Sequence, residues 1–108
     1  MYFVNNNERK GTCYHEFYKG KWDGTSFWKD DSLLLHDDFM NDDFVDAIME
    51  VIPAYSPFGE IEVSIEDWKR IGNIVRNKDA YSQALYKEAD IWLESVFKEY
   101  GCFTILGV

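Results

Sequence analysis

Apolar and polar side chains alternate in parts of this chain, and this alternation predicts several short strands. In residues 58–65, Ile61 and Val63 alternate with acidic residues, as in a strand with one buried face. The dipeptide Asp23-Gly24 predicts a hairpin turn. Further strands are predicted where apolar and β-favouring residues cluster, in residues 1–4, 12–18 and 102–108.

Other stretches have apolar residues at helical spacing. They predict three helices: residues 38–52, residues 65–76, and a third that begins after Asn77 or Asp79 and runs to about residue 100. Ser64 opens a capping-box-like start for the second helix, and Gly101 is well placed to end the third. We therefore expect one α+β domain over residues 1–108, with an about four-stranded, mainly antiparallel sheet and three helices packed against it.

The first predicted helix is strongly amphipathic. Projected at 100° per residue, its apolar side chains gather on one side and its acids on the other. The acids are Asp38, Asp42, Asp46 and Glu50 at i, i+4 spacing, with Asp43 beside them. Like charges at this spacing destabilise a helix, so stability alone would favour lysines between them. Phe39 projects into the acidic face, where it resembles an interface anchor inside a polar rim.

Negative charge is concentrated in one segment of the chain. The net charge is −9, yet the segment from Asp30 to Trp68 holds twelve acids and no Lys or Arg. Direct nucleic-acid binding and an anionic membrane surface are disfavoured by this charge. Two interpretations remain open, a solvated surface and a docking surface for a basic protein. For the second, the predicted partner-binding residues are Asp37, Asp38, Phe39, Asp42, Asp43, Asp46, Glu50, Glu60 and Glu62.

The sequence contains no recognisable motif for catalysis, metal binding or a cofactor. The aspartate run lacks the spacing and the glycine of a calcium-binding loop. Cys13 and His15 lie on one side of a predicted strand, and we expect a buried cysteine and a partly buried histidine there. We therefore expect no cofactor, no metal and no catalytic residue. No signal peptide and no membrane-length apolar run is recognised, so we expect a cytoplasmic protein.

The segments "HDDFMNDDFVDAIME" and "EIEVSIED" carry a resemblance of type. A small, acidic, aromatic-rich chain without a catalytic motif resembles the immunity proteins of bacterial contact-dependent growth inhibition and related polymorphic toxin systems. It is similar in principle to barstar, which sets an acidic helix against a basic cleft. The resemblance implies a cytoplasmic inhibitor of a toxin, often a nuclease. The alternatives are a regulatory, adaptor or DNA-mimic module that binds another basic protein, or an enzyme that uses Cys13 and His15.

Overall fold

A five-stranded antiparallel sheet with three helices forms the structure, a computed structural model that covers residues 1–108. The strands are β1 (Phe3–Val4), β2 (Tyr14–Lys19), β3 (Leu33–His36), β4 (Glu60–Ser64) and β5 (Cys102–Leu106). They lie in the order β1-β3-β2-β5-β4, and every neighbouring pair is antiparallel. The α+β class and the antiparallel sheet are confirmed, with one strand more than predicted.

The helices are α1 (Asp42–Val51), α2 (Ile65–Val75) and α3 (Ala80–Tyr100), with two short 3-10 turns, η1 (Asn6–Glu8) and η2 (Asp37–Phe39). The Ser64 hydroxyl accepts a hydrogen bond from the Asp67 amide at 3.1 Å and so caps α2 as predicted. Gly101 ends α3 with a φ of +76°, a left-handed conformation that glycine adopts without strain. Both helix boundaries therefore follow from local residue chemistry.

The strand β3 was not predicted, and the predicted hairpin at Asp23-Gly24 does not form. The Asp23 carboxylate accepts hydrogen bonds from the amides of Thr25 and Ser26, at 2.9 and 2.8 Å. This local turn leads into a long loop over residues 20–32 instead of a returning strand. The partner of β2 on that side is β3, whose three leucines form an apolar run without alternation. Such a run lacks the period-two signal by which half-buried strands are recognised.

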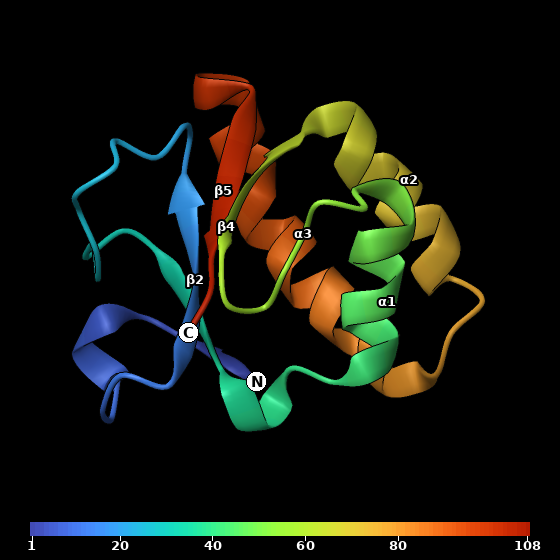
Figure 1. The fold of residues 1–108 in the computed structure, drawn as a ribbon, viewed down its shortest axis with the longest axis horizontal. Helices are drawn as coiled ribbons and strands as arrows, with labels where there is room; N and C mark the ends of the chain where they lie inside the picture. The colour runs from blue at the N-terminus through green and yellow to red at the C-terminus, as the bar shows by residue number, and fades with distance from the viewer.

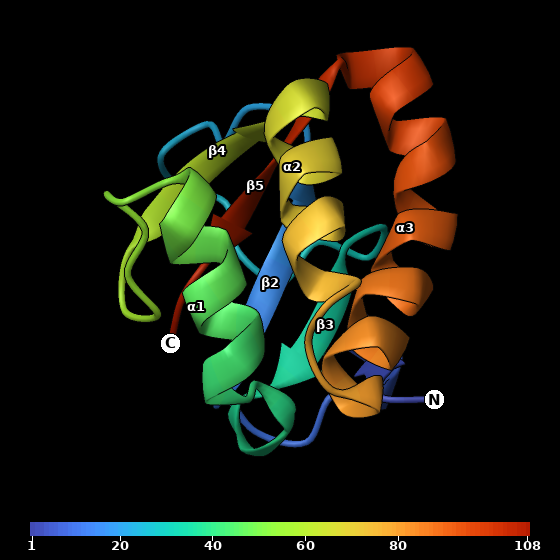
Figure 2. The same cartoon turned by 90° about the vertical axis from the view of Figure 1, so that its right-hand side faces the viewer.

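All three helices cover one face of the sheet, and the long loops cover the other (Figures 1 and 2). The core between helices and sheet includes Phe17, Phe103 and Val63 from the strands, with Phe44 and Trp68 from the helices. Because loops pack on the opposite face, the central strand β2 is buried on both sides. The helix layer leaves one side of α1 open to solvent.

Candidate functional site

The outer side of α1 forms an acidic face. Asn41 caps the helix, since its side-chain oxygen accepts a hydrogen bond from the Phe44 amide at 3.2 Å. At 100° per residue the exposed acids span an arc of about 100°. They are Asp42, Asp43, Asp46 and Glu50, and we call them the α1 acidic face. The predicted amphipathic helix is confirmed for this part of the chain.

Packing on the inner side explains how α1 tolerates these repulsions. Phe44, Ala47 and Ile48 are fully buried against the sheet and the other helices. Full burial of a large apolar side chain contributes about 1.5–3 kcal/mol. A like-charge pair at i, i+4 costs only about 0.2–0.5 kcal/mol. Burial therefore outweighs the repulsion, and the acids can remain together without unfolding the helix.

No basic side chain of the protein neutralises the α1 acidic face. The ion pairs with Lys or Arg join Lys19 to Asp31, Arg70 to Asp67, and Lys98 to Glu94, all outside α1. The other two pairs join histidines to aspartates of η2. The negative field of these four carboxylates therefore remains available to another molecule.

The residues Asp37, Asp38 and Phe39 lie on η2 and not on α1, so the prediction of a helix from residue 38 is wrong. The chain leaves β3 at His36 and must turn before a helix can begin, and Met40 separates the two helical segments in an extended conformation. The stripe at i, i+4 spacing consequently begins at Asp42. Asp38 lies close to His36 instead, with 3.6 Å between its carboxylate and the imidazole Nδ1.

Asp37 is engaged within the protein. Its Oδ1 lies 2.8 Å from Nε2 of His15, a fully buried side chain on β2. Burial lowers the pKa of His15, and the hydrogen bond to Asp37 partly opposes this effect. Burial also raises the pKa of Tyr55 to about 12, and the negative charge of Asp37 contributes. Asp37 therefore has an internal role, although half of its side chain is exposed.

Phe39 belongs to a surface aromatic cluster. Its ring is 42% exposed and packs edge-on against Tyr2 at 5.6 Å between centroids, and Tyr2 packs against Tyr81 at 4.9 Å. The Tyr81 hydroxyl donates a hydrogen bond to the Phe39 carbonyl. Sequence reasoning missed Tyr2 and Tyr81, because they come from the two distant segments that flank η2 in space. The cluster holds Phe39 in one position next to the start of α1.

Glu60 and Glu62 lie on a different surface from the α1 acidic face. In β4, Val63 is fully buried under the helices and Ile61 packs against the same core. Because side chains alternate along a strand, Glu60 and Glu62 point to the opposite face of the sheet. There Glu60 lies beside Phe58, a residue that is 79% exposed. The nine predicted binding residues are therefore distributed over two faces of the protein.

The predicted burial of Cys13 is wrong, and His15 is more buried than predicted. Cys13 is exposed, immediately before β2, and both Cys13 and Cys102 are free thiols. His15 lies inside the sheet-helix core with 0% exposure. No three His, Cys, Asp or Glu side chains converge in an arrangement that could hold a metal ion.

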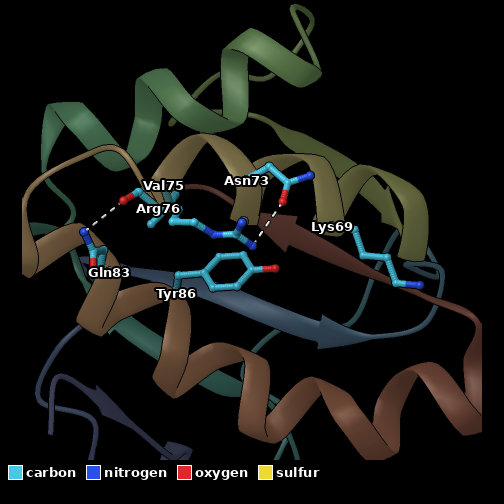
Figure 3. Close-up of a pocket in the computed structure, with 7 residues that line it drawn as sticks. Lys69, Asn73, Val75, Arg76, Gln83 and Tyr86 are labelled. Atoms are coloured by element: carbon cyan, nitrogen blue, oxygen red, sulfur yellow. Dashed lines mark hydrogen bonds between the residues drawn. The ribbon is translucent and has the colours of Figure 1, made fainter.

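A pocket of about 470 Å³ opens between α2 and α3 (Figure 3). Lys69 and Asn73 line it from α2, Arg76 lines it as the residue that caps the end of α2, and Gln83 and Tyr86 line it from α3. Sequence reasoning did not identify this pocket. The available signal was residues 69–78, which hold four basic residues and no acid in an otherwise acidic protein.

No family model, no curated protein and no solved structure matches the chain. None of the helices is long and apolar enough to cross a membrane. A functional assignment therefore depends on the geometry and charge of the surfaces described above.

Proposed function

We propose that this protein binds and neutralises a basic partner protein, as an immunity protein does with a nuclease toxin. The observation that carries the proposal is the α1 acidic face, four exposed carboxylates in one arc without a Lys or Arg partner in the chain. These carboxylates would occupy the groups with which the toxin binds nucleic-acid phosphates. The protein would then block the toxin's active site without catalysing a reaction itself.

Charge on this face supports binding in two ways. A cleft of opposite sign on the partner is attracted at long range, which raises association rates by about ten- to a thousandfold. At contact, a fully desolvated carboxylate paired with a partner cation becomes expensive to remove, at about 2–5 kcal/mol. Repulsion within α1 in the free protein is consistent with a face selected for binding rather than for stability.

Apolar contact beside the carboxylates supports the same proposal. Met49, at the edge of the acidic arc, is 39% exposed, and Phe39 is 42% exposed at the preceding turn. An interface of this type combines a few apolar anchors with a charged rim. Phe39 suits the role of an anchor because Tyr2 and Tyr81 hold its position, so that little conformational entropy is lost on binding.

The first test identifies the partner. The tagged chain is purified from its own cells under low salt, and co-purifying proteins are identified by mass spectrometry. We expect a basic protein whose nuclease activity is inhibited when one equivalent of this chain is added. A basic partner without such activity would instead favour the adaptor interpretation, and a DNA-binding protein displaced from DNA would favour the DNA mimic.

The second test locates the contact by isothermal titration calorimetry with that partner. Asp46→Asn and Glu50→Gln should each weaken binding at least tenfold at low salt, and the difference should shrink as salt is added. Glu94→Gln on α3 is the matched control, because Glu94 is also exposed but is paired with Lys98 at 3.9 Å. If Asp46→Asn and Glu50→Gln bind like the wild type, or no more weakly than Glu94→Gln, the α1 acidic face is not the docking surface.

A third variant separates the two acidic surfaces. The double substitution Glu60→Gln and Glu62→Gln neutralises the opposite face of the sheet and leaves α1 intact. We expect little change in affinity, because one compact partner that covers α1 does not reach that face. A loss with this variant alone would move the docking surface to β4.

A further inference from the structure

We propose that the pocket between α2 and α3 binds a phosphate monoester of mononucleotide size. The first argument is charge. Lys69 and Arg76 line this pocket and no Asp or Glu does, and neither residue forms an ion pair within the protein. By contrast, Arg70 on the same helix lies outside the pocket and is paired with Asp67 at 3.9 Å. Of Lys69, Arg70 and Arg76, the two without an ion pair are therefore the ones that line the pocket.

The hydrogen-bonding groups of the pocket suit an anion with several oxygens. Arg76 donates from Nη2 to Oδ1 of Asn73 at 3.3 Å, which directs its guanidinium along the pocket (Figure 3). The other N–H groups of Arg76 make no further hydrogen bond in the protein, and the side-chain nitrogen of Asn73 makes none. A guanidinium with free donors matches the oxygen geometry of a phosphate. Lys69 adds a second positive charge two helical turns away.

Gln83 stabilises the rim of the pocket. Its side-chain nitrogen donates to the carbonyls of Arg76 and Lys78, at 3.3 and 3.0 Å. These carbonyls lie in the turn directly after α2, where no further helical amide can reach them. Gln83 therefore holds the backbone of Arg76 against α3 and keeps its side-chain oxygen as a free acceptor.

The wall of the pocket is flat and rigid. The Tyr86 ring stacks on Trp68, with 4.2 Å between centroids and 13° between planes, and its hydroxyl donates to the Trp68 carbonyl at 2.9 Å. Opposite this hydroxyl, α2 carries Gly72. A Cβ at that position would lie only 2.4 Å from the Tyr86 oxygen. The absence of a side chain at residue 72 is what allows the ring to pack this closely.

The volume of the pocket identifies the class of ligand further. A space of about 470 Å³ falls within the range of small-molecule sites and exceeds the need of a bare phosphate ion. The aromatic wall and the amide groups beside it suit a nucleoside. A nucleic-acid strand is disfavoured because the net charge of −9 repels a polyanion. A single nucleoside monophosphate carries only about two negative charges and is small enough to approach this one basic region.

A second pocket provides the competing location for an anion. Lys19, Lys21 and Lys29 surround a space of about 200 Å³, but Asp31 also lines it and lies 4.0 Å from Lys19. This carboxylate competes with any bound anion for the lysines. We therefore expect phosphate compounds to prefer the pocket between α2 and α3.

The test is a titration of the full chain with AMP, adenosine and inorganic phosphate, followed by NMR and calorimetry. We expect AMP to shift the side-chain amide signals of Asn73 and Gln83. Inorganic phosphate should bind more weakly than AMP, and adenosine more weakly still. Arg76→Ala should weaken AMP binding about tenfold or more, since a charge-assisted hydrogen bond is lost. Lys69→Gln should weaken it severalfold.

Arg70→Ala is the matched control, because it removes an arginine of the same charge from α2 at a position outside the pocket. Circular dichroism checks that each variant is folded. If Arg76→Ala does not fold, Lys69→Gln takes its place in the comparison. The proposal is overturned if Arg76→Ala and Arg70→Ala bind AMP equally well, or if AMP shifts no signal at millimolar concentration. The proposal is also overturned if AMP shifts only the NMR signals of residues around the pocket of Lys19, Lys21 and Lys29. If inorganic phosphate binds as tightly as AMP, the nucleoside part of the proposal is wrong.

Discussion

The imidazole of His15 and the carboxylate of Asp37 join the central strand to the turn before α1. Their Nε2 and Oδ1 atoms lie 2.8 Å apart. An ionised carboxylate only accepts hydrogen bonds, so Nε2 carries the proton in neutral His15. The other ring nitrogen, Nδ1, is buried and has no partner. This contact fixes η2, and η2 in turn positions Phe39 beside the α1 acidic face.

The state of His15 makes stability depend on pH. Burial is the largest effect on its pKa and lowers it below the ordinary value of 6.5. As the pH falls below 6.5, the unfolded chain takes up a proton on this residue before the folded protein does. The free energy of unfolding therefore decreases, by at most about 1.4 kcal/mol per pH unit for one proton, until the folded pKa is reached.

The free energy of unfolding, measured with urea at several pH values between about 7.5 and 5, checks this prediction, because its slope with pH reports the protons that His15 takes up on unfolding. His15→Gln should remove this contribution and give a flatter dependence than the wild type, whatever its stability at neutral pH. His36→Gln is the comparison variant, because His36 has the smallest of the effects on the pKa of His15, so most of the pH dependence should remain while His15 is present. Parallel curves for His15→Gln and the wild type would show that His15 does not control this transition.

Repulsion within α1 predicts a substitution that stabilises the free protein. Glu50→Lys replaces a like-charge pair with Asp46 by an opposite-charge pair in the favourable i, i+4 orientation. The free energy of unfolding should rise by about 0.4–1 kcal/mol at low salt, and the gain should fade in high salt. Glu94→Lys on α3 is the control, because it loses the pair with Lys98 but gains one with Asp90, so no comparable gain is expected. A loss of stability in Glu50→Lys would mean that the acids do not repel one another.

The buried carboxylate of Glu16 organises the loop over residues 20–32. It is 1% exposed and accepts hydrogen bonds from the amides of Trp28 and Lys29 at 2.7 and 3.1 Å, and from the Ser32 hydroxyl at 2.6 Å. Glu16→Gln presents an amide group to these donors and should cost at least about 2 kcal/mol of stability. Chemical denaturation measures the loss, and amide exchange should show a looser loop.

The matched control for Glu16 is Glu62→Gln. Glu62 lies on the same face of the sheet, but it is exposed and accepts no hydrogen bond that holds a loop. Its substitution should change the free energy of unfolding by less than about 0.5 kcal/mol. Equal effects of the two substitutions would contradict the role given to Glu16.

Close packing at Gly72 predicts a costly substitution. In Gly72→Ala the new Cβ meets the hydroxyl of Tyr86, which cannot move freely because it is stacked on Trp68. Overpacking should cost about 1–3 kcal/mol, partly offset by the better helix propensity of alanine. Thermal and urea unfolding measure this. Gly59→Ala is the control, because its Cβ would meet no atom closer than 3.9 Å.

Elements with a strong local signal were predictable from sequence. Helices α2 and α3 combine an apolar stripe with identifiable ends, and β4 alternates clearly. The start of α1 was predicted at residue 38 rather than at Asp42, because Asp37, Asp38 and Asn41 can all cap a helix. A tertiary contact selects Asn41 as the cap: its side-chain nitrogen donates a hydrogen bond to the hydroxyl of Ser82 on α3 at 3.0 Å. No local pattern contains that information.

The sequence by itself determined that α1 is amphipathic and that its acids face outward, because helical spacing and charge are local properties. It also determined where α2 begins and where α3 ends, since Ser64 and Gly101 act on their own helices. Only the tertiary structure decided that Glu60 and Glu62 lie on another face, and that Tyr2, Phe39 and Tyr81 meet. It likewise decided that Lys69 and Arg76 line a pocket with Tyr86. These relationships join residues distant in the chain, and they depend on how sheet and helices pack rather than on neighbouring residues.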